Sequence, residues 1–310
     1  NLSRPDWKSS SDRKENMIFL DKNENNDKIL QKIYKKTFNH LIENSISRYP
    51  DNSFLYNKLA LHLELDASNL LLGAGSDGII RSVFESIINP GDKVILTSPT
   101  FAMYPIYSKI YQCDVIEIKY SRKKNVPYMD KNLLLELIRS SNAKLLCLPN
   151  PDSPTGTVFA PNDIKEILIE SASVNTLVLI DEAYYPFYDI SSIGLINEFE
   201  NLIVTRTFAK AWGLAGLRVG YGISNNDLMK YLHKIKSMYE INTLGSNILF
   251  NAIDNYDEVM KSVNRLNQGK KWFMSEMKSM NFETWESHGN FSHVNFAKNT
   301  EIILFSIDNH

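Results

Sequence analysis

Two pairs of reactive side chains follow short apolar runs of the chain. Asp181 and Tyr184 come directly after one run, and Lys210 and Arg218 come after the next. Continuous apolar runs predict strands covered on both faces, and open α/β sheets place their sites at the carboxyl ends of such strands. We therefore expect a carboxylate, a phenol, an amine and a guanidinium to converge on one small anionic ligand that contains nitrogen.

Lys210 has the surroundings that favour nucleophilic chemistry. It lies among apolar and small residues between Phe208 and Trp212, and a glycine-rich turn follows at 213–216. A lysine side chain is usually solvated. Partial burial, however, lowers the pKa of an amine and allows it to form a Schiff base. The segment therefore predicts a Schiff-base lysine.

Gly75, Ser76 and Asp77 predict a second ligand-binding element. They follow an apolar run and open an expected helix over 77–88. Small residues at such a point let backbone N–H groups approach a phosphate at the helix N-terminus. A plain helix cap is the alternative interpretation of so short a motif.

The apolar runs alternate with segments whose patterns predict helices. The runs are continuous rather than alternating in polarity, as in parallel strands covered by helices on both faces. The expected strands are 94–97, 144–148, 176–180 and 202–205, and the expected helices include 77–88 and 162–171. This alternation predicts an α/β fold with a mainly parallel sheet.

The pattern changes after about residue 225. Long amphipathic helices are expected over 227–238 and 258–280, and a strand over 291–296. Because 310 residues exceed what one compact core usually holds, we expect two domains. The expected divisions are an N-terminal arm over 1–45, a large domain over 46–225 and a smaller α+β domain over 226–310. The sequence starts without Met and stops without an obvious helix end, so we expect the last domain to be incomplete in it.

Composition disfavours several classes of function. The formal net charge is -2, so no field of one sign favours binding to nucleic acid or a membrane surface. No apolar run reaches the roughly 18 residues of a membrane helix. Cys113 and Cys147 lie in apolar stretches, which favours buried, reduced thiols and a cytoplasmic location. The histidines lack metal-ligand spacing, so no metal site is expected.

The assembled motifs resemble a known family over nearly the whole chain, from about Phe19 to Phe296. The family is the fold-type I enzymes that depend on pyridoxal 5′-phosphate (PLP), in the class I/II aminotransferase group and its histidinol-phosphate aminotransferase branch. The matching blocks are 21–25, 48–51, 75–77, 99–104, 150–156, 181–184 and 206–221. The resemblance implies the aspartate aminotransferase fold, with a seven-stranded type of sheet in the PLP-binding domain.

The resemblance also implies roles around the PLP ring. Lys210 would carry the cofactor as a Schiff base and move a proton between the substrate Cα and the cofactor. Asp181 would pair with the pyridine N–H and keep the ring an electron sink. Tyr184 would hydrogen-bond the phenolic O3′, and Tyr104 would stack on the ring face.

Other residues are implied at the phosphate and the substrate. Arg218 suits phosphate because its guanidinium binds in bidentate fashion. Tyr49 would reach the phosphate from a neighbouring subunit, which implies a homodimer. The remaining implied phosphate contacts are Gly75, Ser76, Asp77 and Thr207, and the implied substrate contacts are Asn23, Tyr104 and Asn290.

The chain departs from the family pattern in two places. Relatives carry asparagine at the position of Ser153, where it helps to hold O3′. The shorter serine is expected to reach O3′ only through water, which leaves Tyr184 as the main partner, while Asp152 adds a negative charge nearby. The family's C-terminal arginine, which binds the substrate anion, has no match in 297–310. It lies outside this sequence, or substrate recognition differs.

Three functions remain open. The leading hypothesis is a ping-pong aminotransferase that acts on a small amino compound, expected to be phosphorylated, with a 2-oxo acid as co-substrate. A PLP-dependent decarboxylase of threonine phosphate or serine phosphate would share every cofactor contact and differ in which Cα bond stands perpendicular to the ring. A non-catalytic binding protein is the third, and the presence of Lys210 and Asp181 argues against it.

Overall fold

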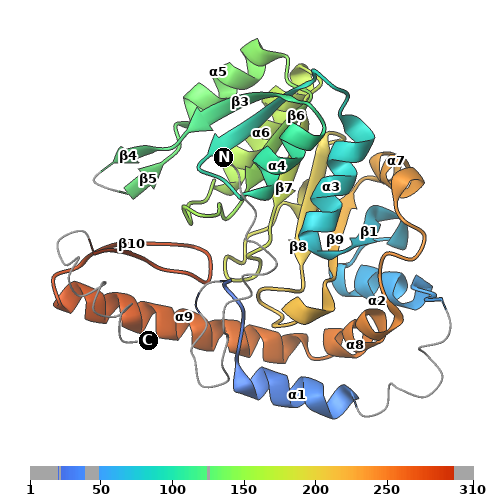
Figure 1. Ribbon diagram of the computed structural model, residues 1–310, viewed down its shortest axis with the longest axis vertical. Helices are drawn as coiled ribbons and strands as arrows, with labels where there is room; N and C mark the ends of the chain where they lie inside the picture. Colours follow the sequence, from blue (N-terminus) through green and yellow to red (C-terminus); the bar gives the residue numbers. More distant parts are fainter. Residues whose placement is uncertain (1–19, 21, 39–48, 124–125, 297–310) are drawn as a thin grey trace.

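A seven-stranded sheet forms the centre of the computed structural model, which describes residues 20, 22–38, 49–123 and 126–296 (Figure 1). The strand order is β1-β9-β8-β7-β6-β2-β3. Pairs from β8 to β3 are parallel, and β9 runs antiparallel to both of its neighbours. The strands are β1 Leu70–Gly73, β2 Lys93–Ser98, β3 Asp114–Lys119, β6 Leu145–Pro149, β7 Leu177–Asp181, β8 Leu202–Thr207 and β9 Gly220–Ser224. The predicted, mainly parallel sheet is confirmed.

The apolar strand runs are continuous because both faces of the sheet are covered. Along β6, Leu146 and Leu148 enter one hydrophobic cluster, whereas Leu145 and Cys147 enter another on the opposite face. Neighbouring side chains of a strand point to opposite faces, so a strand buried twice needs apolar residues throughout. The helices associated with the sheet are α3 Gly75–Ile87, α4 Met103–Ile110, α5 Lys131–Ser141, α6 Pro161–Ser173 and α7 Asn226–Ile235.

A second group of helices lies below the sheet in Figure 1, where the long helix α9 runs above α1. Helix α1 contacts α8 and α9, and α2 contacts α8. These helices are α1 Lys28–Phe38, α2 Ser53–Leu63, α8 Thr243–Ile253 and α9 Tyr256–Ser279. The described residues also form two antiparallel strand pairs, β4 Ser121–Lys123 with β5 Val126–Tyr128 and β10 Glu283–Trp285 with β11 His293–Asn295. Three short 3-10 helices lie at Ala67–Asn69, Ile193–Leu195 and Ala215–Leu217.

The expected elements after residue 225 are present with different bounds, since α9 begins at Tyr256 rather than 258. Helix α7 ends at Ile235, before the predicted end at 238, and β11 covers only His293–Asn295 of the strand expected over 291–296. The proposed domain boundaries remain predictions. Within the described residues, we found no helix with the length and hydrophobicity that a membrane crossing requires.

Candidate active site

A pocket of about 550 Å³ opens where β7 and β8 end and α3 begins. The parallel direction of β7 and β8 brings their carboxyl ends to the same edge of the sheet. The predicted site residues that line the pocket are Asn23, Ser76, Asp77, Ser153, Asp181, Tyr184, Thr207, Lys210 and Arg218. The structure therefore brings together residues that are widely separated in the sequence.

Asp181 lies at the inner end of the pocket and is buried. Its Oδ2 accepts a hydrogen bond from the Tyr104 hydroxyl at 3.2 Å, and its Oδ1 accepts one from the Ala183 N–H at 3.0 Å. Burial raises the pKa of Asp181 to about 7, against the opposing effect of these hydrogen bonds. A carboxylate in such a place gains from a cationic N–H partner, which a pyridinium ring provides.

Lys210 follows β8, and its Nζ lies 5.8 Å from the centre of the Tyr184 ring. The Nζ donates a hydrogen bond to the Lys22 carbonyl oxygen at 2.6 Å. Burial lowers the pKa of Lys210, and the positive charge of Arg218 lowers it further, while Glu24 and Asp181 act in the opposite direction. A lowered pKa favours the neutral amine, the form that attacks a carbonyl carbon.

The Tyr184 hydroxyl accepts a hydrogen bond from the Asn23 amide at 2.9 Å. Burial raises the pKa of Tyr184, and hydrogen bonds with Ser153 and Asn23 lower it in part. Ser153 and Tyr184 both line the pocket. A phenol held in this way can donate to an oxygen in the pocket, with the serine as its neighbour.

The predicted phosphate-binding residues meet around the first turn of α3. Gly75 has φ +76°, and a Cβ there would lie only 3.0 Å from Arg218 Nη2. Gly220 of β9 passes so close to the same turn that a Cβ on it would lie 2.3 Å from the Gly75 carbonyl carbon. The backbone N–H groups of a helix start, a guanidinium and the Thr207 hydroxyl form a donor set that fits a phosphate.

Tyr104 is predicted to stack on the PLP ring but is not among the residues that line the pocket, so its stacking role remains a prediction. Tyr104 is fully buried and does not line the pocket, because α4 begins at Met103 and turns this side chain inward to Asp181. Phe101, in the turn before α4, lines the pocket instead. Sequence reasoning missed Phe101, although the same motif contains both rings. The sequence does place Phe101 in the turn between the end of β2 and the start of α4, where side chains can face a pocket at the edge of the sheet.

Gly75, Tyr49 and Asn290 also lie outside the pocket lining. The Tyr49 side chain is 79% exposed and stacks on Tyr239 with 4.3 Å between ring centres. The Asn290 amide donates a hydrogen bond to the Asn23 carbonyl oxygen at 2.8 Å, so Asn290 contacts a residue that lines the pocket. Neither side chain is among those that line the pocket.

Asp152 is turned away from the pocket. Its carboxylate accepts hydrogen bonds from the Thr155 hydroxyl at 2.6 Å and the Thr155 N–H at 3.1 Å, and one from Thr97 at 3.4 Å. Burial raises the pKa of Asp152 to about 6. Asp152 thus stabilises its own turn, and its negative charge, expected from the sequence, acts to raise the pKa of Tyr184. The predicted absence of the C-terminal arginine concerns 297–310, which lie outside the described residues.

Comparison with known proteins agrees with this geometry. The family model for aminotransferase class I and II matches residues 15–304. A histidinol-phosphate aminotransferase of Thermoanaerobacter sp. (strain X514) is 36% identical over 280 residues, which cover 89% of this chain and 78% of that protein. A second relative with this name, from Caldanaerobacter subterraneus subsp. tengcongensis, is 32% identical and covers 91% of this chain and 80% of its own length.

Solved structures share the fold. The histidinol-phosphate aminotransferase of Sinorhizobium meliloti, solved with PLP, has a TM-score of 0.76 at 22% identity and covers 88% of this chain and 74% of that chain. The aspartate aminotransferase of Thermus thermophilus with maleate has a TM-score of 0.73 at 18% identity and covers 84% and 72%. From the family match and the identity with curated relatives, the chain belongs to the aminotransferase class I and II family, the PLP-dependent transferases that its motifs resemble.

Proposed function

We propose that this chain moves an amino group between a small phosphorylated amino compound and a 2-oxo acid in a ping-pong reaction, as a PLP-dependent aminotransferase of the histidinol-phosphate branch. One observation carries the proposal: a half-buried Lys210 lies in the same pocket as a buried Asp181 and the Arg218 guanidinium. The relatives at 36% and 32% identity carry the histidinol-phosphate aminotransferase name, which supports the branch.

The proposed catalytic residues are Lys210, Asp181 and Tyr184. PLP, when bound, supplies an electron sink for charge that develops at the substrate Cα. Lys210 holds the cofactor and transfers the proton at Cα, for which its lowered pKa suits it. Asp181 binds the ring N–H, and Tyr184 donates to the phenolic oxygen, with Ser153 and Asn23 orienting its hydroxyl.

The proposed phosphate contacts are the N–H groups of Ser76 and Asp77, the Thr207 hydroxyl and Arg218. Gly75 contributes through its positive φ and its missing side chain, which let the helix start approach the ligand. Phe101 replaces Tyr104 as the proposed stacking partner of the ring, and Tyr104 orients Asp181. On the substrate side Asn23 is retained as a contact, and Asn290 acts by holding Asn23.

A homodimer is proposed from the exposed tyrosine pair. Tyr49 and Tyr239 stack on each other at the surface, and Met238 and Leu244 beside them are also exposed. Glu240, in the same segment, accepts a hydrogen bond from the Ala74 N–H directly before α3. An aromatic and apolar surface that continues to the phosphate-binding turn suits a second copy, whose Tyr49 would complete the phosphate contacts. A cytoplasmic location remains part of this proposal.

The test uses the purified protein loaded with PLP. Histidinol phosphate and threonine phosphate are each added alone and with 2-oxoglutarate, while absorbance and carbon dioxide release are followed. Conversion to the pyridoxamine form, with release of the matching carbonyl product, supports transamination. Carbon dioxide release without the 2-oxo acid would indicate decarboxylation and contradict the proposal.

Lys210→Ala gives the matched control. We expect activity to fall by at least about 10²- to 10⁴-fold, the usual contribution of a general acid–base group. The absorbance band of the Schiff base should also disappear in this variant. A wild-type protein that binds no PLP, or a band that persists without Lys210, would rule out the assigned role.

A further inference from the structure

We propose that an ion pair between Asp27 and Arg265 latches the segment that covers the pocket, and that both act as positioning residues for substrate binding. The segment is residues 22–27, called the strap below. This inference rests on the proposed function, since it concerns the substrate side of the same pocket. Neither residue lines the pocket.

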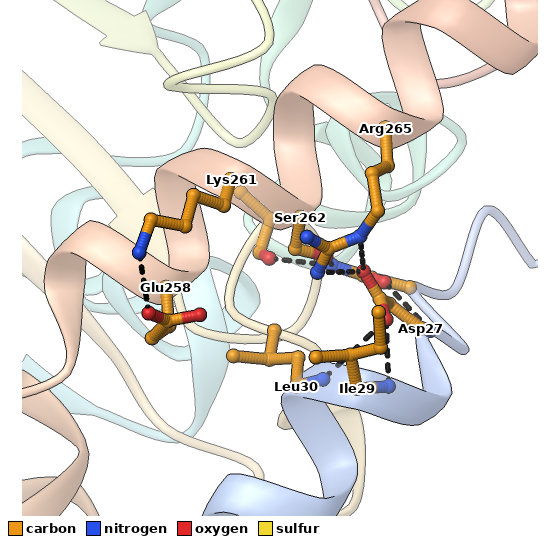
Figure 2. Close-up of polar contacts among 9 residues, drawn as sticks. Asp27, Ile29, Leu30, Glu258, Lys261, Ser262 and Arg265 are labelled. Carbon is orange, nitrogen blue, oxygen red and sulfur yellow. Dashed lines mark hydrogen bonds and ion pairs between the residues drawn. The ribbon is translucent and has the colours of Figure 1, made fainter.

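Asp27 joins two helices at the end of the strap (Figure 2). Its Oδ2 accepts hydrogen bonds from Arg265 Nε at 2.8 Å and Nη2 at 2.5 Å, and Arg265 belongs to α9. Its Oδ1 accepts from the Ile29 N–H at 2.8 Å and the Leu30 N–H at 3.4 Å, at the start of α1. The same carboxylate therefore stabilises the first turn of α1 and fixes that turn to α9.

The ion pair is more protected than an ordinary surface pair. The Asp27 side chain is 8% exposed and that of Arg265 is 36% exposed. Burial acts to raise the pKa of Asp27, but hydrogen bonds with Ser262 and Arg265 and with the backbone lower it overall. The carboxylate is therefore charged at neutral pH, which a two-pronged contact with a guanidinium requires.

Other residues of the strap, close to Asp27 in the sequence, form hydrogen bonds that reach the proposed catalytic side chains Tyr184 and Lys210. Asn25 is buried, and its amide donates to the Ala211 carbonyl oxygen at 2.8 Å and to Ser262 Oγ at 3.0 Å. Asn23 then donates to the Tyr184 hydroxyl at 2.9 Å, and the Lys22 carbonyl accepts from Lys210 at 2.6 Å. Lys22, Asn23 and Glu24 all line the pocket.

The position of the strap beside the pocket therefore depends on its contacts with α9. Without the Arg265 contact, the strap keeps only the hydrogen bonds of Asn25 and Asp27 with Ser262 of α9, and the contacts at Tyr184 and Lys210 become transient. Of the proposed cofactor contacts, Tyr184 and Lys210 meet the strap, whereas Asp181, Thr207 and the first turn of α3 are held by the sheet and its helix. Loss of the latch should therefore weaken substrate binding more than it slows the chemical steps.

The experiment compares Arg265→Met with Lys261→Met. Lys261 also lies on α9 and pairs with Glu258 at 2.7 Å, but its side chain is 62% exposed and the pair does not reach the strap (Figure 2). We expect Arg265→Met to raise KM about five- to tenfold with kcat within about threefold, as the loss of one partly buried charged contact implies. Lys261→Met should change neither constant.

Hydrogen exchange of the strap in the cofactor-free protein gives a readout that is independent of activity. Arg265→Met should speed the exchange of backbone amides in 22–27 about tenfold or more while leaving those of β7 and β8 unchanged. Arg265→Lys, which keeps the charge but loses the fork, should fall between wild type and Arg265→Met. This variant also keeps the test available if Arg265→Met does not fold.

The latch proposal is wrong if the backbone amides of 22–27 exchange at the wild-type rate in Arg265→Met. If the methionine variant does not fold, the same criterion applies to Arg265→Lys. The proposal is also wrong if Lys261→Met accelerates exchange as much as the Arg265 variant does. If wild type shows no aminotransfer but the exchange results are as expected, the proposed function fails and the latch stands. The two outcomes are therefore distinguishable.

Discussion

The two walls of the pocket are held in different ways. The sheet wall, formed by Asp181, Thr207 and Lys210 at and after the ends of β7 and β8, rests on strands buried on both faces. The strap opposite is a single irregular segment tied down by side-chain hydrogen bonds. The residues proposed to hold the cofactor thus lie on a rigid element, and the residues proposed to meet each new substrate lie on one that local contacts control.

Each wall has its own ion pair, and the pairs differ in burial. Glu182 and Arg206, which directly follow Asp181 and precede Thr207, pair at 2.9 Å with side chains only 2% and 4% exposed. Glu182 also accepts from the Ser192 N–H at 2.6 Å, and Arg206 donates to the Ser191 hydroxyl at 2.7 Å. The buried pair therefore joins the ends of β7 and β8, next to both cofactor residues, whereas the Asp27 pair lies at a partly exposed helix contact.

The largest effect is expected when the sheet wall is broken. Arg206→Met leaves the Glu182 carboxylate buried without its cation, so we expect the free energy of unfolding to fall by about 3–5 kcal/mol. Urea denaturation of the cofactor-free protein measures this change. Lys230→Met, which removes an exposed pair with Asp227, is the control and should stay within about 0.5 kcal/mol of wild type. Equal losses in the two variants would contradict the comparison.

A smaller effect, with a defined pH dependence, is expected at Asp181. Its folded-state pKa of about 7 lies above the ordinary value of 3.8, so the stability associated with its proton is present at low pH and is lost as pH rises through 7. Asp181→Asn removes this loss. The cofactor-free variant should gain about 2–4 kcal/mol relative to wild type between pH 4 and pH 8, at about 1.4 kcal/mol per pKa unit.

Thermal or urea unfolding across this pH range checks the Asp181 prediction. The same substitution should lower aminotransfer by about 10²-fold, since a preorganised charge at the ring is removed. Greater stability and lower activity of Asp181→Asn would show that the buried Asp181 carboxylate lowers the stability of the fold while it contributes to the reaction. A stability difference that does not vary with pH would contradict the raised pKa.

The smallest effect is expected at Phe101 and Tyr104, and it tests which of the two side chains stacks on the PLP ring. Phe101→Leu should raise the dissociation constant for PLP about three- to tenfold, because an aromatic contact of this kind is worth about 0.5–1.5 kcal/mol. Tyr104→Phe keeps the buried ring and loses only the hydroxyl bond to Asp181, so it should shift the pH dependence of the absorbance band with little change in affinity. The reverse pattern would restore Tyr104 as the stacking residue.

The parts of the fold that the sequence predicts are those set by local pattern. Val94 and Leu96 face one cluster and Ile95 the other, so an apolar run with no alternation already indicates a doubly covered strand. Residues at the ends of such strands, such as Asp181 and Lys210, are predicted to converge by the geometry of parallel sheets alone. The proposed phosphate-binding turn at Gly75 is predicted for another reason, because small residues follow an apolar run there and open a helix.

The remainder depends on contacts between distant segments or on helix phase. Tyr104 turns inward because α4 starts at Met103, and boundaries of this kind are uncertain by a residue or two in any sequence pattern. The Asp27–Arg265 pair joins segments far apart in the chain, and neither residue belongs to a motif. Asn290 follows α9 in the chain, and its hydrogen bond to the Asn23 carbonyl oxygen depends on how the chain folds back after that helix.

The close approach of Gly220 to the first turn of α3 has a consequence for synthesis of the protein. The ribosome makes Gly75 long before it makes β9, and the turn is not packed into its final place until Gly220 lies against it. A nascent chain that still lacks β9 therefore lacks the strand against which the Gly75 turn packs. We expect the proposed phosphate site to reach its final form only after translation has passed β9.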